Sequence, residues 1–486
     1  MADTRAERRG WKRRVAASAC LPVLGAVAGG LGPDVIVSDI TSMVRYTPLS
    51  NITAYSAGSR ACNIGDVPAI WHPQNNQHPI ITQGMFRLRN GRFEQIGVSW
   101  CKHGFAAIQE GILCGNCVPA PDFTALGPGC SDPYTAANNG GQPILGPRFQ
   151  VNANNGHFAY PYWQQGQSGS SIYKRLQVRT SDIDPTHNQG ALYFVEAQYV
   201  TPDDAIAGNG LNNASFRQVS IPTVVATPTF VGPVEVQRSA LEAWKDHDPG
   251  VTLVNVDFVE HHDVPTPSDV VARFIVAARA TPNANGTWAY EYAVSNVNSH
   301  RSASALAVSV PCGLPVSAPG FHDVAYHSGD GHPLGSTPQD FDGTDWTPGR
   351  VPGGALRWAA VPAAQPENTN ALRWGTLYNV RFVAPTPPTD GTLEITLFRP
   401  GAPGEPASVL ATGLPVPSAR ACTPDFDGSG SVATSDVSAF LSAWFADLAQ
   451  GTNLAGDFNC DGVVASTDLS AFLSAWFAAI SGGGCP

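Results

Sequence analysis

The residues with the most evident chemistry lie near the C-terminus, where one unit of sequence occurs twice. Residues 425–446 and 457–478 both begin with oxygen-bearing side chains at alternate positions, and both have glycine at the sixth position. Calcium takes about six to eight oxygen ligands, and glycine at that position lets the chain turn sharply around one ion. The spacing therefore predicts two calcium loops and two bound Ca²⁺ ions.

The expected ligands follow from their positions in each loop. Positions 1, 3, 5 and 12 offer side-chain oxygens, and position 7 offers its backbone carbonyl. The first loop supplies Asp425, Asp427, Ser429, Ser431 and Asp436, and the second supplies Asp457, Asn459, Asp461, Val463 and Asp468. Position 9 is Ala433 or Ala465, whose methyl group cannot coordinate an ion, so we expect a water molecule at that vertex.

Each loop runs into a segment with helical periodicity. Apolar residues recur at intervals of three and four, at Val437, Phe440, Leu441, Trp444, Phe445 and Leu448 and again at Leu469, Phe472, Leu473, Trp476, Phe477 and Ile480. This pattern predicts two amphipathic helices. Neither helix can bury its stripe alone, so we expect the two to pack face to face about a pseudo-twofold axis. In so small a domain, bound ions should supply much of the folding free energy.

Aspartate at position 12, Asp436 and Asp468, replaces the glutamate of the usual EF-hand. Paired loops of this kind, each followed by one helix and with no helix in front, resemble a type I dockerin. The chain also ends in Gly484-Cys485-Pro486, which resembles the GC-type dockerins found at the end of a group of secreted bacterial proteins. The resemblance spans residues 422–486 and implies a docking domain whose partner is a cohesin-like or other extracellular protein.

In type I dockerins, the residues at loop positions 10 and 11 contact the partner. The resemblance therefore implies that the matching hydroxyl residues bind the partner here, namely Thr434, Ser435, Ser466 and Thr467. An alternative is that these hydroxyls only cap the helices, as serine and threonine often do. Type I dockerins also carry basic residues further along, whereas no Lys or Arg follows Arg420 in this chain, which argues against an ordinary cohesin as the partner.

The N-terminus indicates where the protein goes. Basic residues between positions 5 and 14 precede an apolar run from Val15 to Val27, and Ala26-Val27-Ala28 provides a small-x-small cleavage site. This pattern predicts a secretory signal peptide over residues 1–28. No other stretch has the length of a membrane-spanning helix, so we expect a secreted protein, extracellular or at the cell surface, with no membrane span. The net charge of −11 argues against nucleic acid as a partner.

Of the ten cysteines, Cys20 leaves with the signal peptide, and the others are expected to form disulfides in an exported chain. Cys422 and Cys485 bracket the repeat and could join the ends of the tail, which would leave Cys460 unpaired. Four cysteines of the body have symmetric spacing, which allows a zinc site as an alternative; they are Cys101, Cys114, Cys117 and Cys130.

The rest of the chain has the composition of a loop-rich, all-β body. It contains many of the 41 prolines and 49 glycines, which separate short runs of alternating or β-branched residues. We expect a β-rich cysteine-containing domain over 33–230, an immunoglobulin-like sandwich over 231–400, a linker over 401–420 and the dockerin-like α domain over 421–486. The two body domains should meet near a short helix within 236–247. Residues 83–103 and 191–215 also resemble other secreted bacterial proteins with the same tail, a family without an established activity.

The body offers weaker candidates for chemistry than the tail. Three histidines and two aspartates lie close together in the sequence and could hold a transition metal in an oxidoreductase: His322, Asp323, His327, Asp330 and His332. A glycoside hydrolase is another alternative, because the resemblance links dockerins to polysaccharide-degrading enzymes and because catalytic carboxylates are defined by their separation in space. The leading hypothesis is a calcium-binding modular protein whose tail anchors a β-rich body, with carbohydrate as one candidate ligand.

Overall fold

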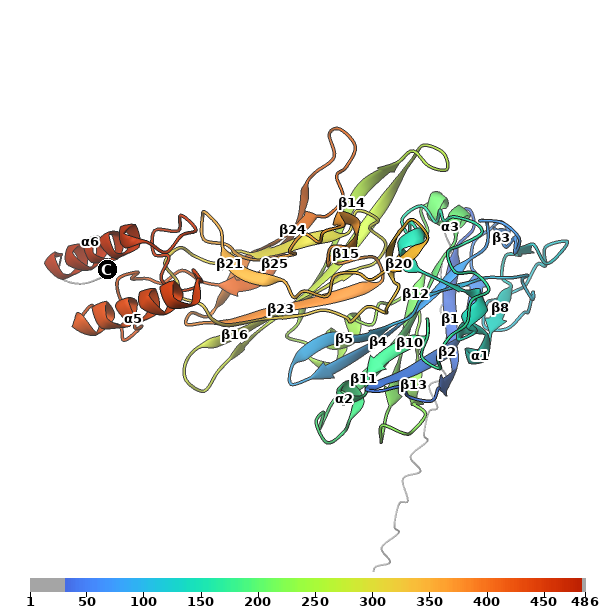
Figure 1. The fold of residues 1–486 in the computed structure, drawn as a ribbon, viewed down its shortest axis with the longest axis horizontal. Helices are drawn as coiled ribbons and strands as arrows, with labels where there is room; N and C mark the ends of the chain where they lie inside the picture. The colour runs from blue at the N-terminus through green and yellow to red at the C-terminus, as the bar shows by residue number, and fades with distance from the viewer. Residues whose placement is uncertain (1–30, 483–486) are drawn as a thin grey trace, which may run out of the picture.

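A computed structural model describes residues 31–482, so the predicted signal peptide and Cys485 lie outside the described residues. Three parts follow one another along the chain (Figure 1). They are a region built on a large β-sheet, a β-sandwich, and a pair of helices that project from the end of the sandwich away from the large sheet. The prediction of a mainly β protein with a small helical C-terminal region is confirmed.

The N-terminal region is built on one antiparallel sheet of 11 strands, whose main path runs in the order β1-β2-β10-β5-β4-β11-β12-β13. These strands are β1 (Val35–Arg45), β2 (Ile52–Asn63), β10 (Leu176–Arg179), β5 (Arg92–Val98), β4 (Ile80–Arg89), β11 (Leu192–Val200), β12 (Ala214–Ser220) and β13 (Thr229–Glu235), with β6 (Cys101–His103), β8 (Ser131–Tyr134) and β9 (Leu145–Gly146) off this path. Successive side chains of a strand point to opposite faces. In β11, Tyr193 and Val195 lie in one core and Phe194 lies in another, so the centre of the sheet is covered on both faces.

The second region is a sandwich of two five-stranded antiparallel sheets, ordered β14-β15-β16-β23-β18 and β21-β22-β17-β24-β25. The first contains β14 (Thr252–His262), β15 (Ser268–Pro282), β16 (Trp288–Asn296), β23 (Thr376–Ala384) and β18 (Ser317–His322). The second contains β21 (Thr347–Arg350), β22 (Leu356–Ala359), β17 (Ala303–Val308), β24 (Pro388–Leu397) and β25 (Ser408–Pro417). Their inward faces share one core, where Tyr290 stacks on Phe382 with ring centroids 5.2 Å apart and Trp358 is fully buried.

Two domain boundaries differ from those expected. Residues 401–420 are not a linker, because β25 pairs with β24 and completes the second sheet of the sandwich. Proline and glycine obscure the strand pattern in this segment, yet Val409, Ala411 and Leu414 lie in the sandwich core. At the other boundary, β13 pairs with β12 and extends the N-terminal region to Glu235.

Helix α4 (Glu242–His247) lies where the two β regions meet, as the sequence predicts. Its Trp244 is fully buried in a core that also contains Phe93 of the first region and Leu377 of the second. The side chain of Gln95 accepts a hydrogen bond from the backbone N–H of Leu377 at 2.8 Å. Because apolar contacts and hydrogen bonds both cross this junction, the two β regions form one packed body.

Shorter elements lie in the connections, and two longer helices form the tail. The short ones are β3 (Ala69–Ile70) paired with β7 (Ala125–Leu126), β19 (Gly331–Leu334) paired with β20 (Thr337–Gln339), and helices α1 (Ala136–Asn139), α2 (Thr180–Ile183) and α3 (Pro202–Ala207). The tail helices are α5 (Thr434–Gln450) and α6 (Ser466–Ser481), which begin at the end of the two predicted calcium loops. The prediction of two helices after the loops is confirmed.

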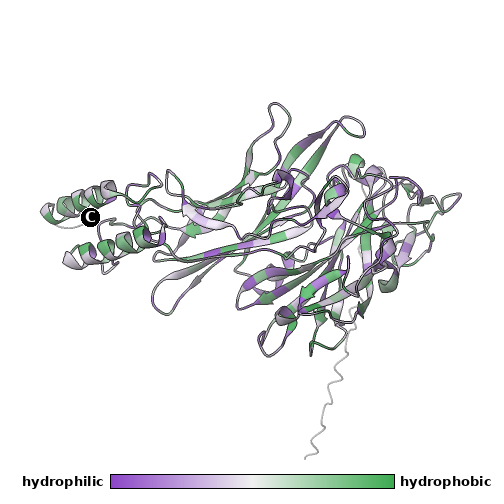
Figure 2. Cartoon of the chain, viewed as in Figure 1, coloured by the Kyte–Doolittle hydropathy of each residue, from purple (hydrophilic) through white to green (hydrophobic). Residues whose placement is uncertain are grey.

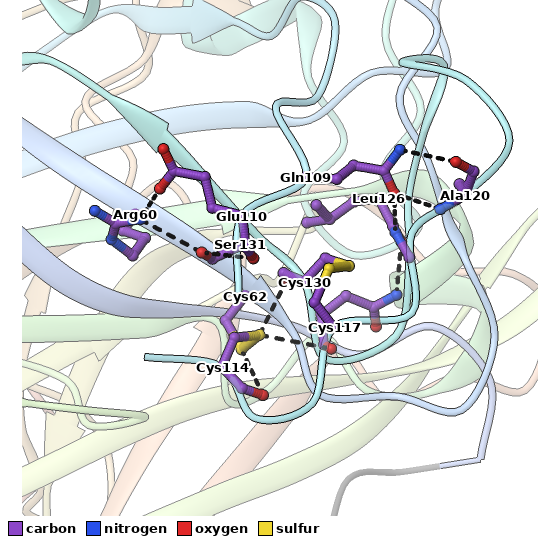
Figure 3. Close-up of a disulfide and its surroundings, with 12 residues drawn as sticks. Arg60, Cys62, Gln109, Glu110, Cys114, Cys117, Ala120, Leu126, Cys130 and Ser131 are labelled. Carbon is purple, nitrogen blue, oxygen red and sulfur yellow. Dashed lines mark hydrogen bonds and ion pairs between the residues drawn. A yellow bond between two sulfur atoms is a disulfide. The ribbon is translucent and has the colours of Figure 1, made fainter. Parts of the chain in front are cut away.

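Two disulfides hold the long connection between β6 and β8 (Figure 3). Cys62–Cys114 fastens this connection to β2, and Cys117–Cys130 closes it on itself. Closing a loop covalently lowers the entropy of the unfolded chain, which stabilises a segment that has little core of its own. The zinc alternative is wrong, because three of its four cysteines are oxidised in these bonds and Cys101 is a buried free thiol.

The third disulfide, Cys312–Cys460, joins the sandwich to the second loop of the tail. The expectation that Cys460 is left unpaired is therefore wrong. Cys422 is also disulfide-bonded, and Cys485, its expected partner, lies outside the described residues. Disulfide formation, as expected from the cysteine content, is confirmed for three pairs.

Candidate metal centre

The first loop brings three carboxylates together. Ligand oxygens of Asp425, Asp427 and Asp436 all lie within 4.8 Å of one another. Within residues 31–482, this is the only group of three or more His, Cys, Asp or Glu residues placed so that it could hold a metal ion. Carboxylates at this spacing repel one another, and they are the ligands that calcium prefers.

Backbone N–H groups fix these carboxylates. Asp425 accepts a hydrogen bond from the backbone N–H of Gly430 at 2.9 Å. Asp436 is fully buried and accepts from Asp427 N–H at 2.9 Å and from Ala433 N–H at 2.8 Å. Gly430 has φ of +84°, a conformation that residues with a Cβ adopt at a cost, so the glycine at position 6 is needed for this turn.

The second loop has the equivalent hydrogen bonds. The N–H of Gly462 donates to Asp457 at 3.1 Å, and Asp468 accepts from Asn459 N–H at 3.0 Å and from Ala465 N–H at 2.8 Å. The other carboxylate oxygen of Asp457, Oδ1, is buried and has no hydrogen-bond partner among the described residues. Because a buried polar atom without a partner is costly, this oxygen is suited to receive a cation at the centre of the loop.

The four hydroxyl residues at positions 10 and 11 are exposed on the first turns of α5 and α6; they are Thr434, Ser435, Ser466 and Thr467. The helix-capping alternative is wrong, because the residues at the N-cap positions are Ala433 and Ala465, whose N–H groups bond to the position-12 aspartates. Hydrogen bonds from the Ser435 hydroxyl and from Ser429 together lower the pKa of Asp427 to about 2. Ser435, one of the predicted partner-binding residues, therefore also stabilises a carboxylate of the first loop.

The two halves of the tail support each other across a pseudo-twofold axis. The indole N–H of Trp444 donates to the carbonyl at position 9 of the second loop, and the indole N–H of Trp476 donates to the carbonyl at position 9 of the first, each at 2.9 Å. Between them, Phe440 and Phe472 are fully buried and stack with ring centroids 4.3 Å apart. The expected face-to-face packing of the helices is thus present, and each helix also positions the loop of the other repeat.

The distal part of the apolar stripe is not buried, contrary to expectation. Phe445 and Phe477 are 60% and 59% exposed, and Leu448 and Ile480 are each 46% exposed. Figure 2 shows hydrophobic residues along both helices. Among residues 31–482, the buried core of the helices consists of residues of the two helices and the two loops, so this core ends near the central phenylalanine pair.

The second loop is attached to the sandwich, a contact that the sequence analysis does not predict. Besides the disulfide at Cys460, the side chain of Asn453 accepts from the backbone N–H of Arg350 at 2.7 Å and donates to the carbonyl of Gly462 at 2.7 Å. The buried guanidinium of Arg350 in turn donates to the carbonyl of Leu454 at 3.2 Å. The odd cysteine at loop position 4 was the one signal that could have suggested a contact with the body.

The histidine-rich segment of the body does not form a metal site. The Nε2 atoms of His322 and His327 donate to backbone carbonyls of the N-terminal region, at 3.0 and 2.7 Å, and His332 packs against the ring of Phe149. Burial lowers the pKa of His327 to about 4, so this side chain is neutral at physiological pH. These residues fasten the two β regions together, and the expectation of a transition-metal site here is wrong.

A scan against protein-family models found no match to the chain, and searches of curated proteins and of solved structures likewise found no similar protein. Among the helices of residues 31–482, none combines the length and the apolar character that crossing a membrane requires.

Proposed function

We propose that this protein is a secreted, calcium-dependent modular protein whose C-terminal domain anchors a rigid β-rich body to a protein partner. The single observation that carries the proposal is the duplicated loop, in which two copies of the same ligand pattern have equivalent backbone hydrogen bonds. Such a match is expected if both copies were selected to hold the same ion.

The loops are unfavourable without a cation. Three carboxylates within 4.8 Å in the first loop repel one another, and a buried carboxylate oxygen in the second has no partner among the described residues. Calcium would offset both costs, with Asp425, Asp427 and Asp436 as ligands in the first loop and Asp457, Asn459 and Asp468 in the second. Because these ligands are assembled only in the folded chain, ion binding would contribute directly to the stability of the tail.

Anchoring is proposed from the exposed surface of the same domain. The hydroxyls Thr434 and Ser435 and their counterparts Ser466 and Thr467 stand at equivalent places around the pseudo-twofold axis, so the domain presents the same small polar surface twice. Three disulfides fit an oxidising compartment, in accord with the basic and apolar pattern of the N-terminus. A cohesin-like or other extracellular protein is the proposed partner.

Calorimetric titration of the calcium-stripped mature chain with Ca²⁺ tests the proposal. We expect two binding events with dissociation constants between about 10⁻⁷ and 10⁻³ M, the range of sensor and extracellular calcium loops. Asp436→Asn and Asp468→Asn should each abolish one event, whereas the control Asp263→Asn, at an exposed residue of the β14–β15 hairpin, should leave both unchanged. Absence of any heat at millimolar Ca²⁺ would refute the proposal.

A further inference from the structure

A cleft of about 540 Å³ lies between the two β regions of the body, far in sequence from the tail. Its floor comes from β5, β10 and α2 of the N-terminal region, and its opposite wall comes from the end of β18 and the chain that follows it, up to Asp345. Small-molecule sites occupy roughly 300–1,000 Å³ and are common where domains meet. Both the size and the position of this cleft are those of a binding site.

The cleft is held open by hydrogen bonds between its two walls. His322 donates from Nε2 to the carbonyl of Gln95, and His327 donates from Nε2 to the carbonyl of Val98. On the wall itself, Asp340 accepts from the backbone N–H of Gly329 at 2.7 Å. A ligand would therefore meet a preformed cavity and would not have to separate the two regions.

Several polar groups that line the cleft have unused hydrogen-bonding capacity. Within residues 31–482, the side chains of Arg179 and Asp345 have no hydrogen-bond or ion-pair partner. Asp323 accepts one hydrogen bond, from Asn370 at 2.6 Å, and the side chain of Gln177 donates to a backbone carbonyl but accepts none within those residues.

One imidazole adds an acceptor to this set. His322 donates from Nε2 to the carbonyl of Gln95, so its Nδ1 can accept from a ligand, whereas the Nδ1 of His327 is buried and out of reach of a ligand. Acceptors therefore outnumber donors in the cleft, although the guanidinium of Arg179 remains as an unpaired donor.

The balance of these groups selects the ligand chemistry. An anionic ligand would face the carboxylates of Asp323 and Asp345, which excludes phosphates and other strong anions. An ammonium ion can only donate, so it would leave Arg179 without an acceptor. A hydroxyl group both donates and accepts, and can therefore serve both walls without adding charge. The half-buried rings of Phe321 and Tyr326 offer apolar surface to the carbon face of such a molecule.

We propose that this cleft binds a neutral, hydroxyl-rich small molecule of the saccharide class. The site is independent of the calcium loops, since none of its lining residues belongs to the tail. The body would then bind its own ligand while the tail anchors the protein to the proposed partner.

Saturation-transfer NMR and calorimetry on the calcium-loaded mature chain test this assignment. The probes are neutral trisaccharides built from glucose, xylose, mannose or N-acetylglucosamine, with the trimers of galacturonate and of glucosamine as anionic and cationic counterparts, and spermidine as a simple polyamine. We expect at least one neutral trisaccharide to bind and the galacturonate trimer not to bind. Reducing-end assays of the same mixtures would distinguish a binding site from a hydrolytic one, and either result agrees with the proposal.

Variants locate the binding. Asp345→Ala and Gln177→Ala change opposite walls of the cleft. Each should weaken the binding of the neutral saccharide by about tenfold or more, the usual cost of losing one well-placed polar contact. Asp263→Asn, outside the cleft, should have no effect, and thermal unfolding checks that each variant is folded. The proposal is overturned if no neutral probe binds, if only spermidine or the glucosamine trimer binds, or if neither wall variant changes the affinity.

Discussion

The two proposed calcium loops of the tail have the same internal hydrogen bonds but different surroundings. In the first, Arg420 donates to the carbonyls of Asp425 and Phe426. This loop is therefore held by the segment that directly precedes it. The second is held by the sandwich through Cys312–Cys460 and through the buried Arg350. Internal duplication thus fixed the hydrogen bonds within each loop, while the stability of each loop depends on a different part of the molecule.

This difference has a consequence for how the body is presented. A tail joined only by a flexible linker would let the body move freely relative to the partner. Here β25 ends at Pro417 inside the sandwich, and the second loop returns to bond with the same sandwich. We therefore expect the tail and the body to move as one rigid unit, with the second loop as the part of the tail that is fixed to the sandwich.

Removing the Cys312–Cys460 disulfide should have the largest effect on the difference between the two loops. Cys312→Ser combined with Cys460→Ser opens a covalent loop that spans a sequence separation of 148 residues. We expect a loss of roughly 3 kcal/mol of stability, because native disulfides of this kind contribute about 2–5 kcal/mol. Calorimetric titration should show weaker calcium binding at one site and unchanged binding at the other.

The matched control for this prediction is Cys62→Ser combined with Cys114→Ser. That pair lies in the N-terminal region, so its loss should lower the melting temperature without changing calcium binding. Equal effects of the two double variants on both calcium sites would show that the second loop does not depend on its link to the sandwich.

The tail also shows which features a sequence can predict. The two helices and their face-to-face packing follow from local spacing and from the repeat, so they could be derived without a structure. The link between Cys312 and Cys460 could not, because ten cysteines allow many pairings and nothing in the local sequence selects one.

The same distinction explains the errors in the body. The prolines and the glycine of Ser408–Pro417 favour a linker in the sequence, whereas pairing with β24 makes this segment a strand. His322 and His327 were grouped by sequence, yet each bonds to a carbonyl that lies more than 200 residues away in the chain. The cleft beside them was missed for the same reason, since its two walls come from different regions.

The crossed tryptophans give a prediction of intermediate size. Trp444→Phe removes a hydrogen bond to the second loop, and Trp476→Phe removes the equivalent bond to the first. Each should cost about 1 kcal/mol, the usual net contribution of one hydrogen bond. The amide NMR signals of Gly430 and Gly462 report on the two loops separately during a calcium titration, so each variant should weaken binding in the opposite repeat.

The sizes of these two effects test the comparison further. The second loop has additional support from the sandwich, so Trp444→Phe should change its affinity less than Trp476→Phe changes that of the first. Equal changes would mean that the body does not stabilise the second loop, and changes within the same repeat as the mutation would contradict the crossed arrangement.

The smallest effect is expected at Arg350, whose charge acts on Asp457 of the second loop and on Asp447 of α5. Burial lowers the pKa of this guanidinium to about 10, so it stays charged at neutral pH, and it lies close enough to Asp457 for the two charges to interact. A positive charge beside a ligand opposes the entry of Ca²⁺. Arg350→Gln removes the charge and keeps hydrogen-bond donors, so it should raise the calcium affinity of the second loop roughly threefold, as expected for a screened pair of charges.

Arg350→Lys separates charge from geometry at this position. Lysine keeps the positive charge but loses the fork of donors that reaches the carbonyls of Leu314, Gly354 and Leu454. If the charge governs the site, the second loop of the lysine variant should bind calcium as tightly as in the unaltered protein, as reported by Gly462. Only the glutamine variant should then bind more tightly. If both variants bind more weakly, Arg350 acts as a brace between sandwich and tail, because losing the brace then outweighs losing the repulsion. The calcium titration followed at the amide signal of Gly430 should be unchanged in both variants, because Arg420 and not Arg350 contacts the first loop.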